Sequence, residues 1–361
     1  MTTRFWLKFG AAALLASVLG SAAARRLHRI SLRGKKVLIT GGSRGLGFAA
    51  ARRFLRQGAD VAICARSEPE LLRASAALRE VAQSVGLSSH GRAPDVLALR
   101  ADVTEPEAAK QLVADVLQRF GRIDVLVNCA VEITIGPLEA LGSADFHQSF
   151  RGIFFALYEP TMAVLSHMKS RGFGRIVNVT SVAGKAPVPH SGTYVAGKFA
   201  TTGFSAVCAA ELRKYGIRVS TVLPPPLRNG AWLNGSYKGL ADQELSWFAR
   251  ALQSPLTSID PERAARAIVR AAEEGRVESM VSPISFLQAR LHALCPTLSV
   301  ALAALIDARS MPPSPLGASA LPALTGEEIV STSESPSVRA VLRRVQADAQ
   351  AYLQPGALKA Q

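Results

Sequence analysis

The chain has 361 residues, of which 48% are hydrophobic and 19% are charged. This length allows one large domain with extensions or two domains, and the composition excludes a largely disordered chain. The net charge is +15, and eight basic residues lie in the first 36 positions, which contain no acidic residue. A nucleic-acid-binding protein carries such charge on a folded face with stacking aromatic residues. Here the charge flanks an apolar segment, so we expect no nucleic-acid partner.

The cysteines indicate neither a disulfide scaffold nor a metal site. The chain contains four of them: Cys64, Cys129, Cys208 and Cys295. This number is too small for a disulfide scaffold of this length, and no cysteine has a partner at C-x-x-C spacing or histidines at zinc spacing. We therefore expect reduced thiols, which are typical of a cytosolic compartment, and no bound metal.

An apolar segment near the start of the chain predicts a membrane anchor. Residues 9–24 form a run of sixteen residues without a charge, preceded by Lys8. A membrane-spanning helix needs about 20 residues, and a flanking lysine can extend its side chain to the headgroups. We expect residues 1–30 to anchor the protein, with the catalytic domain in the cytoplasm. Basic residues mark the cytoplasmic side of a span, and four arginines follow this run: Arg25, Arg26, Arg29 and Arg33.

Two other interpretations of this segment stay open. Arg4 and Lys8, the apolar stretch 11–19 and the alanines 22–24 also fit a signal peptide, which would be cleaved from an exported protein. A helix that lies in the membrane interface is the third interpretation. The dense positive charge after the segment resists translocation and favours the anchor. A soluble cytoplasmic protein is a further alternative.

From residue 36 onwards, short strands alternate with longer helices. The predicted strands are Lys36–Thr40, Asp60–Ala65, Val96–Arg100, Val125–Asn128, Arg175–Thr180 and Arg218–Leu223. The helices predicted between them cover residues 46–57, 67–85, 105–120, 144–171 and 193–215. Strand–helix–strand units of this length predict an α/β fold, a doubly wound parallel sheet with helices on both faces.

The pattern changes after the sixth strand. Three prolines at 224–226 break it. We predict a helix at Asp242–Gln253, a second helix that begins at Asp260 and ends at Glu274, and a last strand at Val277–Ser282. Asp260 followed by Pro261 is a favourable helix start.

The carboxyl-terminal part adds three segments. Residues 283–308 are apolar but interrupted by Arg290 and His292. We expect them to be helical, either packed over the core or lying in a membrane interface. Residues 309–335 are rich in proline, serine and alanine and predict a linker. Residues 336–361 predict a terminal amphipathic helix and a tail.

A glycine-rich turn joins the first strand to the first helix. The sequence there is Thr40-Gly41-Gly42-Ser43-Arg44-Gly45-Leu46-Gly47. Glycines at this place let the backbone turn tightly and approach a pyrophosphate, which rests on the positive amino-terminal end of the helix. We therefore predict a dinucleotide site formed by Gly41, Ser43, Arg44, Gly45, Leu46 and Gly47.

The end of the second strand predicts NADP(H) rather than NAD(H). An NAD site places an acidic residue there for the ribose hydroxyls. This chain has Ala65 followed by Arg66, and Arg44 lies in the glycine-rich turn. Two guanidinium groups and no carboxylate favour the 2′-phosphate of NADP(H), although the alternative of two ordinary surface arginines stays open.

Three residues predict acid–base chemistry. Tyr194 and Lys198 are four residues apart at the start of a long helix, so they share one face. An ammonium beside a phenol is expected to lower the pKa of the tyrosine from its usual value, so that it can exchange a proton near neutral pH. Ser181 ends the fifth strand at the carboxyl edge of the sheet, where ligands bind in such folds.

These residues together resemble the short-chain dehydrogenase/reductase family, within residues 34–282. The motifs that carry the resemblance are Thr40-Gly41-x-x-x-Gly45-x-Gly47, Asp102-Val103, Asn128-Cys129-Ala130, Ser181 and Tyr194-x-x-x-Lys198. The resemblance implies one Rossmann domain, here 31–282, with a substrate loop at 224–258. It also implies hydride transfer between NADP(H) and a carbonyl or secondary alcohol.

The resemblance also implies a role for each site residue. Tyr194 would be the acid/base, Lys198 would hold the nicotinamide ribose and tune Tyr194, and Ser181 would polarise the carbonyl. The further residues that it places at the cofactor are Asp102, Val103 and Asn128.

The chain departs from the family pattern at several positions. Ser149, three residues before Gly152, stands where the family has an asparagine that helps to hold a proton-relay water. Val131, Pro225 and Asn229 replace the usual Gly, Gly and Thr. We expect Ser149 to take the place of the asparagine, less effectively. Val131 is expected to crowd the cofactor.

We expect an apolar or lipid-like carbonyl substrate, because an apolar pocket and a membrane anchor suggest a lipidic ketone. Pro224-Pro225 with an amino-terminal anchor also resembles the 3-ketosphinganine reductases. The expected partners are this small molecule and a membrane, with a homo-oligomer as a further possible assembly. The alternatives are a cofactor-binding scaffold with little or no turnover, for which Ser149 is the main support, and a membrane-organising protein without a cofactor.

Overall fold

The computed structural model describes residues 28–85, 93–255, 257–315, 317, 321–333, 335–336, 338–339 and 350–353. The predicted anchor or signal segment lies outside the described residues, except for its last positions. Most of the predicted terminal helix lies outside them as well. Among the helices that the structure describes, none is long and apolar enough to cross a bilayer.

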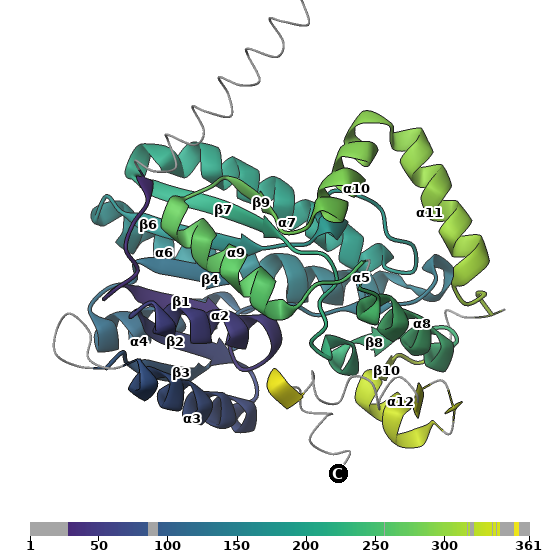
Figure 1. Ribbon diagram of the computed structural model, residues 1–361, viewed down its shortest axis with the longest axis horizontal. Coiled ribbons are helices and arrows are strands. Elements are labelled where there is room, and N and C mark those ends of the chain that lie inside the picture. Colours follow the sequence, from purple (N-terminus) through teal and green to yellow (C-terminus); the bar gives the residue numbers. More distant parts are fainter. Residues whose placement is uncertain are drawn as a thin grey trace, which may run out of the picture.

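A seven-stranded parallel sheet forms the centre of the molecule, in the order β3-β2-β1-β4-β6-β7-β9 (Figure 1). Its strands are β1 (Lys36–Thr40), β2 (Asp60–Ala65), β3 (Val96–Arg100), β4 (Val125–Asn128), β6 (Gly174–Val179), β7 (Ile217–Leu223) and β9 (Glu278–Met280). The predicted fold class is confirmed. Near-continuous apolar strands such as β1 are buried on both faces, as a parallel sheet requires.

Helices cover both faces of this sheet (Figure 1). One face carries α2 (Gly45–Arg56), α3 (Glu68–Ser84) and α9 (Pro261–Glu274). The other face carries α4 (Pro106–Phe120), α6 (Ala156–Ser170) and α7 (Gly192–Glu211). Each layer has its own cluster of buried apolar side chains.

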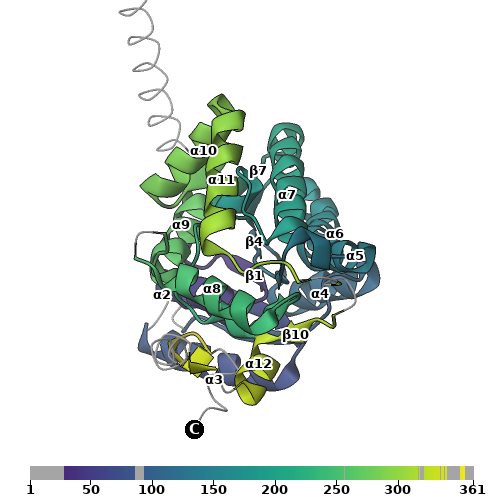
Figure 2. The ribbon, with the colours of Figure 1, turned by 90° about the vertical axis from the view of Figure 1, so that its right-hand side faces the viewer.

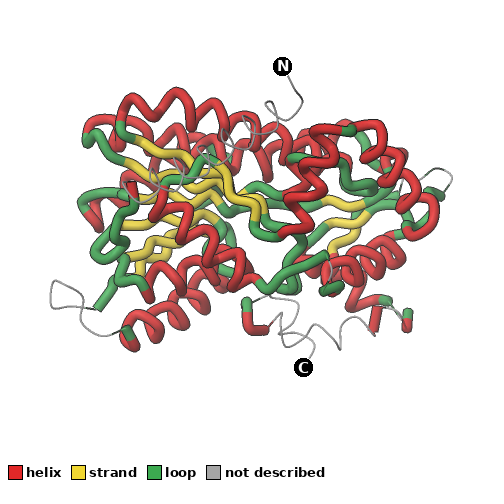
Figure 3. Tube along the Cα trace, turned by 45° about the horizontal axis from the view of Figure 1, so that its top comes forward, coloured by secondary structure: helices red, strands yellow, loops and turns green. Residues whose placement is uncertain are grey.

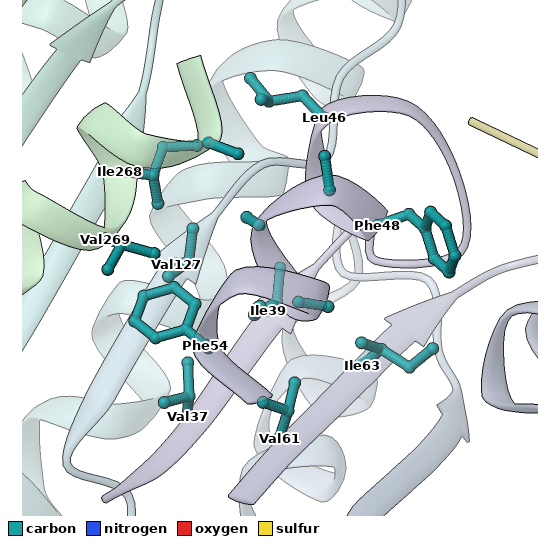
Figure 4. Close-up of a cluster of buried hydrophobic side chains, with 14 of the residues drawn as sticks. Val37, Ile39, Leu46, Phe48, Phe54, Val61, Ile63, Val127, Ile268 and Val269 are labelled. Carbon is teal, nitrogen blue, oxygen red and sulfur yellow. The ribbon is translucent and has the colours of Figure 1, made fainter. Parts of the chain in front are cut away.

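The core under α2 fixes the position of the glycine-rich turn. Phe54 of α2 and Ile268 of α9 pack over Val37 and Ile39 of β1 (Figure 4). All four side chains are fully buried, and burial of each such side chain contributes about 1.5–3 kcal/mol. The first turn of α2 is therefore held rigidly at the carboxyl end of β1.

The predicted helix 144–171 is confirmed in extent, but it is not a regular α-helix throughout. The structure has α5 (Ser143–Phe150), one π-helical turn at Arg151–Phe155, and then α6. The turn lies at Gly152, where an added Cβ would lie 2.7 Å from a carboxylate oxygen of Glu132. Close packing of Glu132 on the backbone thus accompanies the wider turn, and π-helical turns are frequent near functional sites.

A second, small sheet stands beside the main one (Figure 3). It contains β5 (Thr134–Ile135), β8 (Ser236–Tyr237) and β10 (Leu324–Thr325), with α8 (Ala241–Gln253) and α12 (Gly326–Thr332) packed nearby. The expectation of a plain linker at 309–335 is therefore wrong for its second half. Thr325 and Glu328 form a capping box at the start of α12, and Ile329 is fully buried in a third core cluster.

Two further helices follow β9 and project from the body (Figure 2). They are α10 (Pro283–Leu294) and α11 (Pro296–Ser310), joined at Cys295. The predicted helical character of 283–308 is confirmed, but the segment is divided in two because Pro296 cannot continue α10.

Candidate active site

The carboxyl ends of β1, β2, β4 and β6 border a cavity of about 630 Å³. The predicted site residues in its lining are Gly41, Ser43, Arg44, Gly45, Leu46, Gly47, Arg66, Asp102, Val103, Ser181, Tyr194 and Lys198. The lining does not include the two other predicted residues, Asn128 and Ser149. Among the described residues, no group of three or more acidic, cysteine or histidine side chains is arranged to hold a metal ion.

The glycine-rich turn is packed so closely that Gly41 and Gly47 have no room for a side chain. A Cβ on Gly41, whose φ is +66°, would lie 2.8 Å from the Cα atom of Ala130. A Cβ on Gly47 would lie 2.1 Å from the carbonyl oxygen of Gly41. The first turn of α2 contains no acidic residue, so its positive end is not neutralised there. The turn thus forms a cradle that fits the pyrophosphate of a dinucleotide.

The carboxyl-terminal part of the chain reaches this turn. The amide of Gly45 donates a hydrogen bond of 2.8 Å to the carbonyl oxygen of Tyr352. The hydroxyl of Tyr352 donates to Asp260 Oδ1 over 3.2 Å, and the guanidinium of Arg52 lies 5.6 Å from the centroid of its ring. These contacts hold residues 350–353 against α2, and no motif in the sequence indicated them.

Both arginines of the predicted phosphate site form ion pairs. Arg44 Nη1 lies 2.8 Å from Glu70 Oε1, and Ser43 Oγ donates to Glu70 Oε2 over 3.2 Å. Arg66 Nη1 lies 2.5 Å from Glu132 Oε1. Because β2 and β4 flank β1, the second pair crosses the carboxyl end of β1. Sequence reasoning missed both carboxylates, since each pair joins segments that are far apart in the chain.

Ser181, Tyr194 and Lys198 meet at the end of β6. Ser181 follows this strand, and its Oγ accepts a hydrogen bond from the amide of Ala183 and shares another with the hydroxyl of Tyr194. Lys198 Nζ donates to the carbonyl oxygen of Val179 over 3.2 Å and lies 5.5 Å from the ring centroid of Tyr194. The four-residue spacing at the start of α7 directs both side chains to the cavity.

The predicted lowering of the tyrosine pKa is wrong for this structure. Burial raises the pKa of Tyr194 to about 12, and the hydrogen bond with Ser181 offsets only part of this effect. Burial also lowers the pKa of Lys198 to about 8. The ammonium of Lys198 is bonded to the carbonyl of Val179 and does not compensate for the desolvation of the phenol.

Asn128 lies beneath the cavity in a chain of buried hydrogen bonds. Its Nδ2 donates to Thr161 Oγ1 and to Asn178 Oδ1, both over 2.9 Å. Asn178 in turn donates to Ser205 Oγ over 3.0 Å. These bonds join β4, β6, α6 and α7, so Asn128 holds the elements that carry the site in register.

The remaining departures from the family pattern occupy different places. Ser149 is buried near the end of α5, and its neighbours Gln148 and Gly152 line the cavity instead. Val131, Pro225 and Asn229 all belong to the lining. Val131 is 42% exposed, so it presents a side chain to the cavity where a glycine would leave space.

The sheet and the glycine-rich turn define a dinucleotide-binding fold of the Rossmann type. A family model described as short chain dehydrogenase matches residues 35–233, and the chain belongs to the short-chain dehydrogenase/reductase family. It is therefore an oxidoreductase of the class that acts on CH–OH and C=O groups.

Named relatives and a solved structure agree with this assignment. The chain is 28% identical over 275 residues to a 3-ketodihydrosphingosine reductase of Mus musculus, covering 75% of this chain and 78% of that protein. It is 36% identical over 189 residues to a putative ketoacyl reductase of Streptomyces coelicolor, covering 52% and 68%. A crystal structure of a short-chain dehydrogenase from Streptomyces avermitilis superposes with a TM-score of 0.61 at 27% identity, covering 76% of this chain and 98% of that one.

Proposed function

We propose that this protein interconverts a carbonyl and a secondary alcohol by hydride transfer with NADP(H), on an apolar or lipid-like substrate. One observation carries the proposal. Ser181, Tyr194 and Lys198 converge in the same cavity as the glycine-rich turn and the two arginines. The cavity thus brings together an acid–base group and a dinucleotide cradle.

In this proposal each side chain has a defined task. A nicotinamide held in this cavity would supply a hydride to the carbonyl carbon. The hydroxyl of Tyr194 donates the proton to the carbonyl oxygen, and the hydroxyl of Ser181 donates a hydrogen bond to that oxygen. Lys198 would hold the ribose hydroxyls of the cofactor and keep a positive charge near Tyr194. With its pKa raised to about 12, the phenol of Tyr194 carries its proton at neutral pH, as reduction requires.

The two arginines support NADP(H) as the cofactor. Arg44 and Arg66 both line the cavity. The last residue of β2 is Ala65, so this strand does not end in a carboxylate that could bind the ribose hydroxyls of NAD(H). A 2′-phosphate would replace Glu70 on Arg44 and Glu132 on Arg66, which exchanges one charge-assisted contact for another. Asp102 and Val103 line the same part of the cavity and would border the adenine.

The substrate end of the cavity supports an apolar ketone. Its lining there includes Ile133, Ile135, Phe248 and Leu252. The relative from Mus musculus is named for the reduction of 3-ketodihydrosphingosine, a ketone of a long-chain base. A lipid-like ketone is therefore the substrate class that we propose for this chain.

Residues 1–30 would hold this enzyme on a membrane with its catalytic domain in the cytoplasm. The sixteen-residue apolar run and the four arginines after it support this topology. The proposal extends the sequence-based expectation for a segment that the structure describes only from residue 28.

A substrate screen tests the reaction. Purified protein is mixed with NADPH and a series of ketones that differ in chain length, and the loss of NADPH absorbance is followed. We expect turnover that increases with chain length. If NADPH binds and no ketone is reduced, the proposal fails and the scaffold alternative takes its place.

A further inference from the structure

Helices α10 and α11 expose their large apolar side chains and bury their small ones. Within these two helices, all of whose residues the structure describes, the buried side chains are Ser285, Ala289 and Ser299. Nine larger apolar side chains are between 44% and 78% exposed: Ile284, Phe286, Leu287, Leu294, Leu298, Val300, Leu302, Leu305 and Ile306. The three core clusters of the described residues contain no side chain from either helix.

This pattern is the reverse of the one that a water-soluble surface helix shows. Between Pro283 and Ser310 the charged side chains are Arg290, Asp307 and Arg309. The guanidinium of Arg290 lies 5.1 Å from the ring centroid of Phe286. Soluble monomers rarely expose so many large apolar side chains on neighbouring helices, so we infer that the α10–α11 hairpin is covered by a partner.

The lengths of α10 and α11 bear on how the hairpin could contact a membrane. They have 12 and 15 residues, whereas a span needs about 20. Apolar helices that do not span a bilayer can lie in its interface, about 5–10 Å deep at the boundary of headgroups and acyl chains. Neither helix is long enough to span a bilayer, and a shallow insertion fits.

Basic side chains lie on the same side of the molecule as the hairpin. Arg175 donates to the carbonyl oxygen of His28, the first described residue, and Arg213 and Arg218 lie near enough to His28 to interact electrostatically. Arg213 and Lys214, at the end of α7, are exposed. That end of α7 and the hairpin both lie along the upper side of the molecule in Figure 1.

The chain that precedes His28 adds to this pattern. It contains an uncharged sixteen-residue run followed by Arg25 and Arg26. Apolar insertion combined with basic side chains is the chemistry of an anionic lipid surface, where each basic group contributes about 1 kcal/mol. A bilayer therefore explains both the exposed apolar residues and the charge near them.

The hairpin is also attached to the substrate side of the cavity. Asp307 Oδ1 lies 3.1 Å from His190 Nε2, and His190 Nδ1 lies 2.7 Å from Glu244 Oε1 of α8. The same helix α8 contributes Phe248 and Leu252 to the cavity. Helix α10 packs against the turn that follows Ser181 and, through His292, against Phe199 of α7.

We propose that the α10–α11 hairpin inserts its exposed apolar side chains into one leaflet of an anionic bilayer, beside the cavity. This contact is separate from residues 1–27 and does not depend on the reaction. Its use in admitting a lipid-like ketone from the leaflet rests on the proposed function.

The chain offers a native probe site for the test. Cys295 is exposed at the junction of the two helices, whereas Cys64 and Cys208 are buried. The full chain is labelled at Cys295 with an environment-sensitive fluorophore and mixed with vesicles of phosphatidylcholine containing phosphatidylserine. We expect a blue shift of the emission and quenching by lipids with nitroxide groups on their acyl chains. Vesicles without phosphatidylserine should give a weaker response.

A matched control separates insertion from simple tethering. In a Cys295→Ser, Leu72→Cys variant, the label lies on α3, where Leu72 is 65% exposed. Helix α3 lies at the lower side of the molecule in Figure 1, opposite the hairpin. We expect this label to show neither shift nor quenching. A third protein, with Cys295→Ser alone, measures the background from labelling at the partly exposed Cys129.

Three outcomes would overturn the proposal. The first is a label at Cys295 that stays in water although the protein floats with the vesicles. The second is failure of the protein to float. The third is a blue shift without vesicles that grows with protein concentration, which would show that a second copy covers the hairpin. Turnover of a short, water-soluble ketone in the absence of vesicles tests the proposed function independently.

Discussion

The hydroxyl of Tyr194 can be removed without removing the ring that carries it. The Tyr194→Phe variant keeps the ring that packs over Lys198 but removes the hydroxyl bonded to Ser181. We expect ketone reduction to fall by about 10²–10⁴-fold, with NADPH affinity nearly unchanged. Steady-state rates and a fluorescence titration of NADPH measure the two effects. A variant that retains near-normal turnover would remove Tyr194 from its proposed role.

Glu70 competes with the cofactor phosphate for Arg44. The Glu70→Gln variant removes the negative charge that now lies 2.8 Å from the guanidinium. We expect NADPH to bind up to about fivefold more tightly, which corresponds to ~1 kcal/mol for a partly exposed pair. NADH affinity should stay constant, because NADH has no 2′-phosphate.

Glu68→Gln is the matched control for this prediction. Glu68 lies in the same first turn of α3 and is exposed, so its neutralisation should change NADPH affinity little. Weaker NADPH binding in Glu70→Gln would show instead that Glu70 orients Arg44 for the phosphate.

Arg66→Ala should weaken NADPH binding and leave NADH binding nearly unchanged.

Lys198 sets the alkaline limit of activity. Its pKa is lowered to about 8 by burial, whereas the pKa of Tyr194 is raised to about 12. The ammonium is charged below its pKa and neutral above it, so kcat/KM for reduction should be full below about pH 8 and fall above it. A pH profile of kcat/KM reports the groups of the free enzyme. A profile that stays flat to pH 10 would contradict this assignment.

At the scale of single elements, the close packing of Ser149 beside the π-helical turn determines how a larger side chain at this position affects stability. Ser149 is 2% exposed and lies two residues before the π-helical turn, outside the cavity lining. We expect Ser149→Asn to destabilise the fold by about 1–3 kcal/mol, as overpacking does, without an increase in rate. Thermal unfolding and turnover are measured together, with Ser149→Ala as the control that adds no volume. A faster, fully stable asparagine variant would instead support the relay role inferred from the sequence.

The strands were predictable because their signal is local. Buried parallel strands are continuous β-branched runs, and four predicted strands, β1 to β4, match the observed ones at both ends. The π-helical turn between α5 and α6 carries no such signal, because Gly152 is unfavourable in a helix but does not end one. Helix α12 was missed because a short capping box and one buried Ile329 are hidden among proline and serine residues.

The same distinction holds for the site. Tyr194 and Lys198 share a helix turn and Ser181 ends a strand, so their meeting follows from local spacing and sheet topology. Glu70 and Glu132 became visible only when distant segments were brought together, since long-range ion pairs leave no spacing pattern in a sequence. The raised pKa of Tyr194 likewise depends on burial, which spacing does not report.

At the scale of the whole molecule, the family pattern and the additions to it occupy different regions. The family model ends at residue 233. Beyond it, α8 adds Phe248 and Leu252 to the cavity, β10 completes the small sheet, and the α10–α11 hairpin joins α8 through His190. The dinucleotide half thus lies within the family model, while segments beyond it surround the substrate half.

The distribution of charge and apolar residues predicts how the whole protein associates with membranes. Charge alone would give a contact that salt removes, because the screening length falls to about 3 Å at 1 M salt. Burial of apolar side chains in lipid is not screened. We expect the full-length protein to stay with membranes through a 1 M salt wash and to be released by detergent. Mass spectrometry should show that its first 30 residues are retained, because the arginines after the apolar run resist translocation. Release by salt would leave only the electrostatic contact, and a mature protein that begins after Ala24 outside the cytoplasm would show that the segment is a signal peptide.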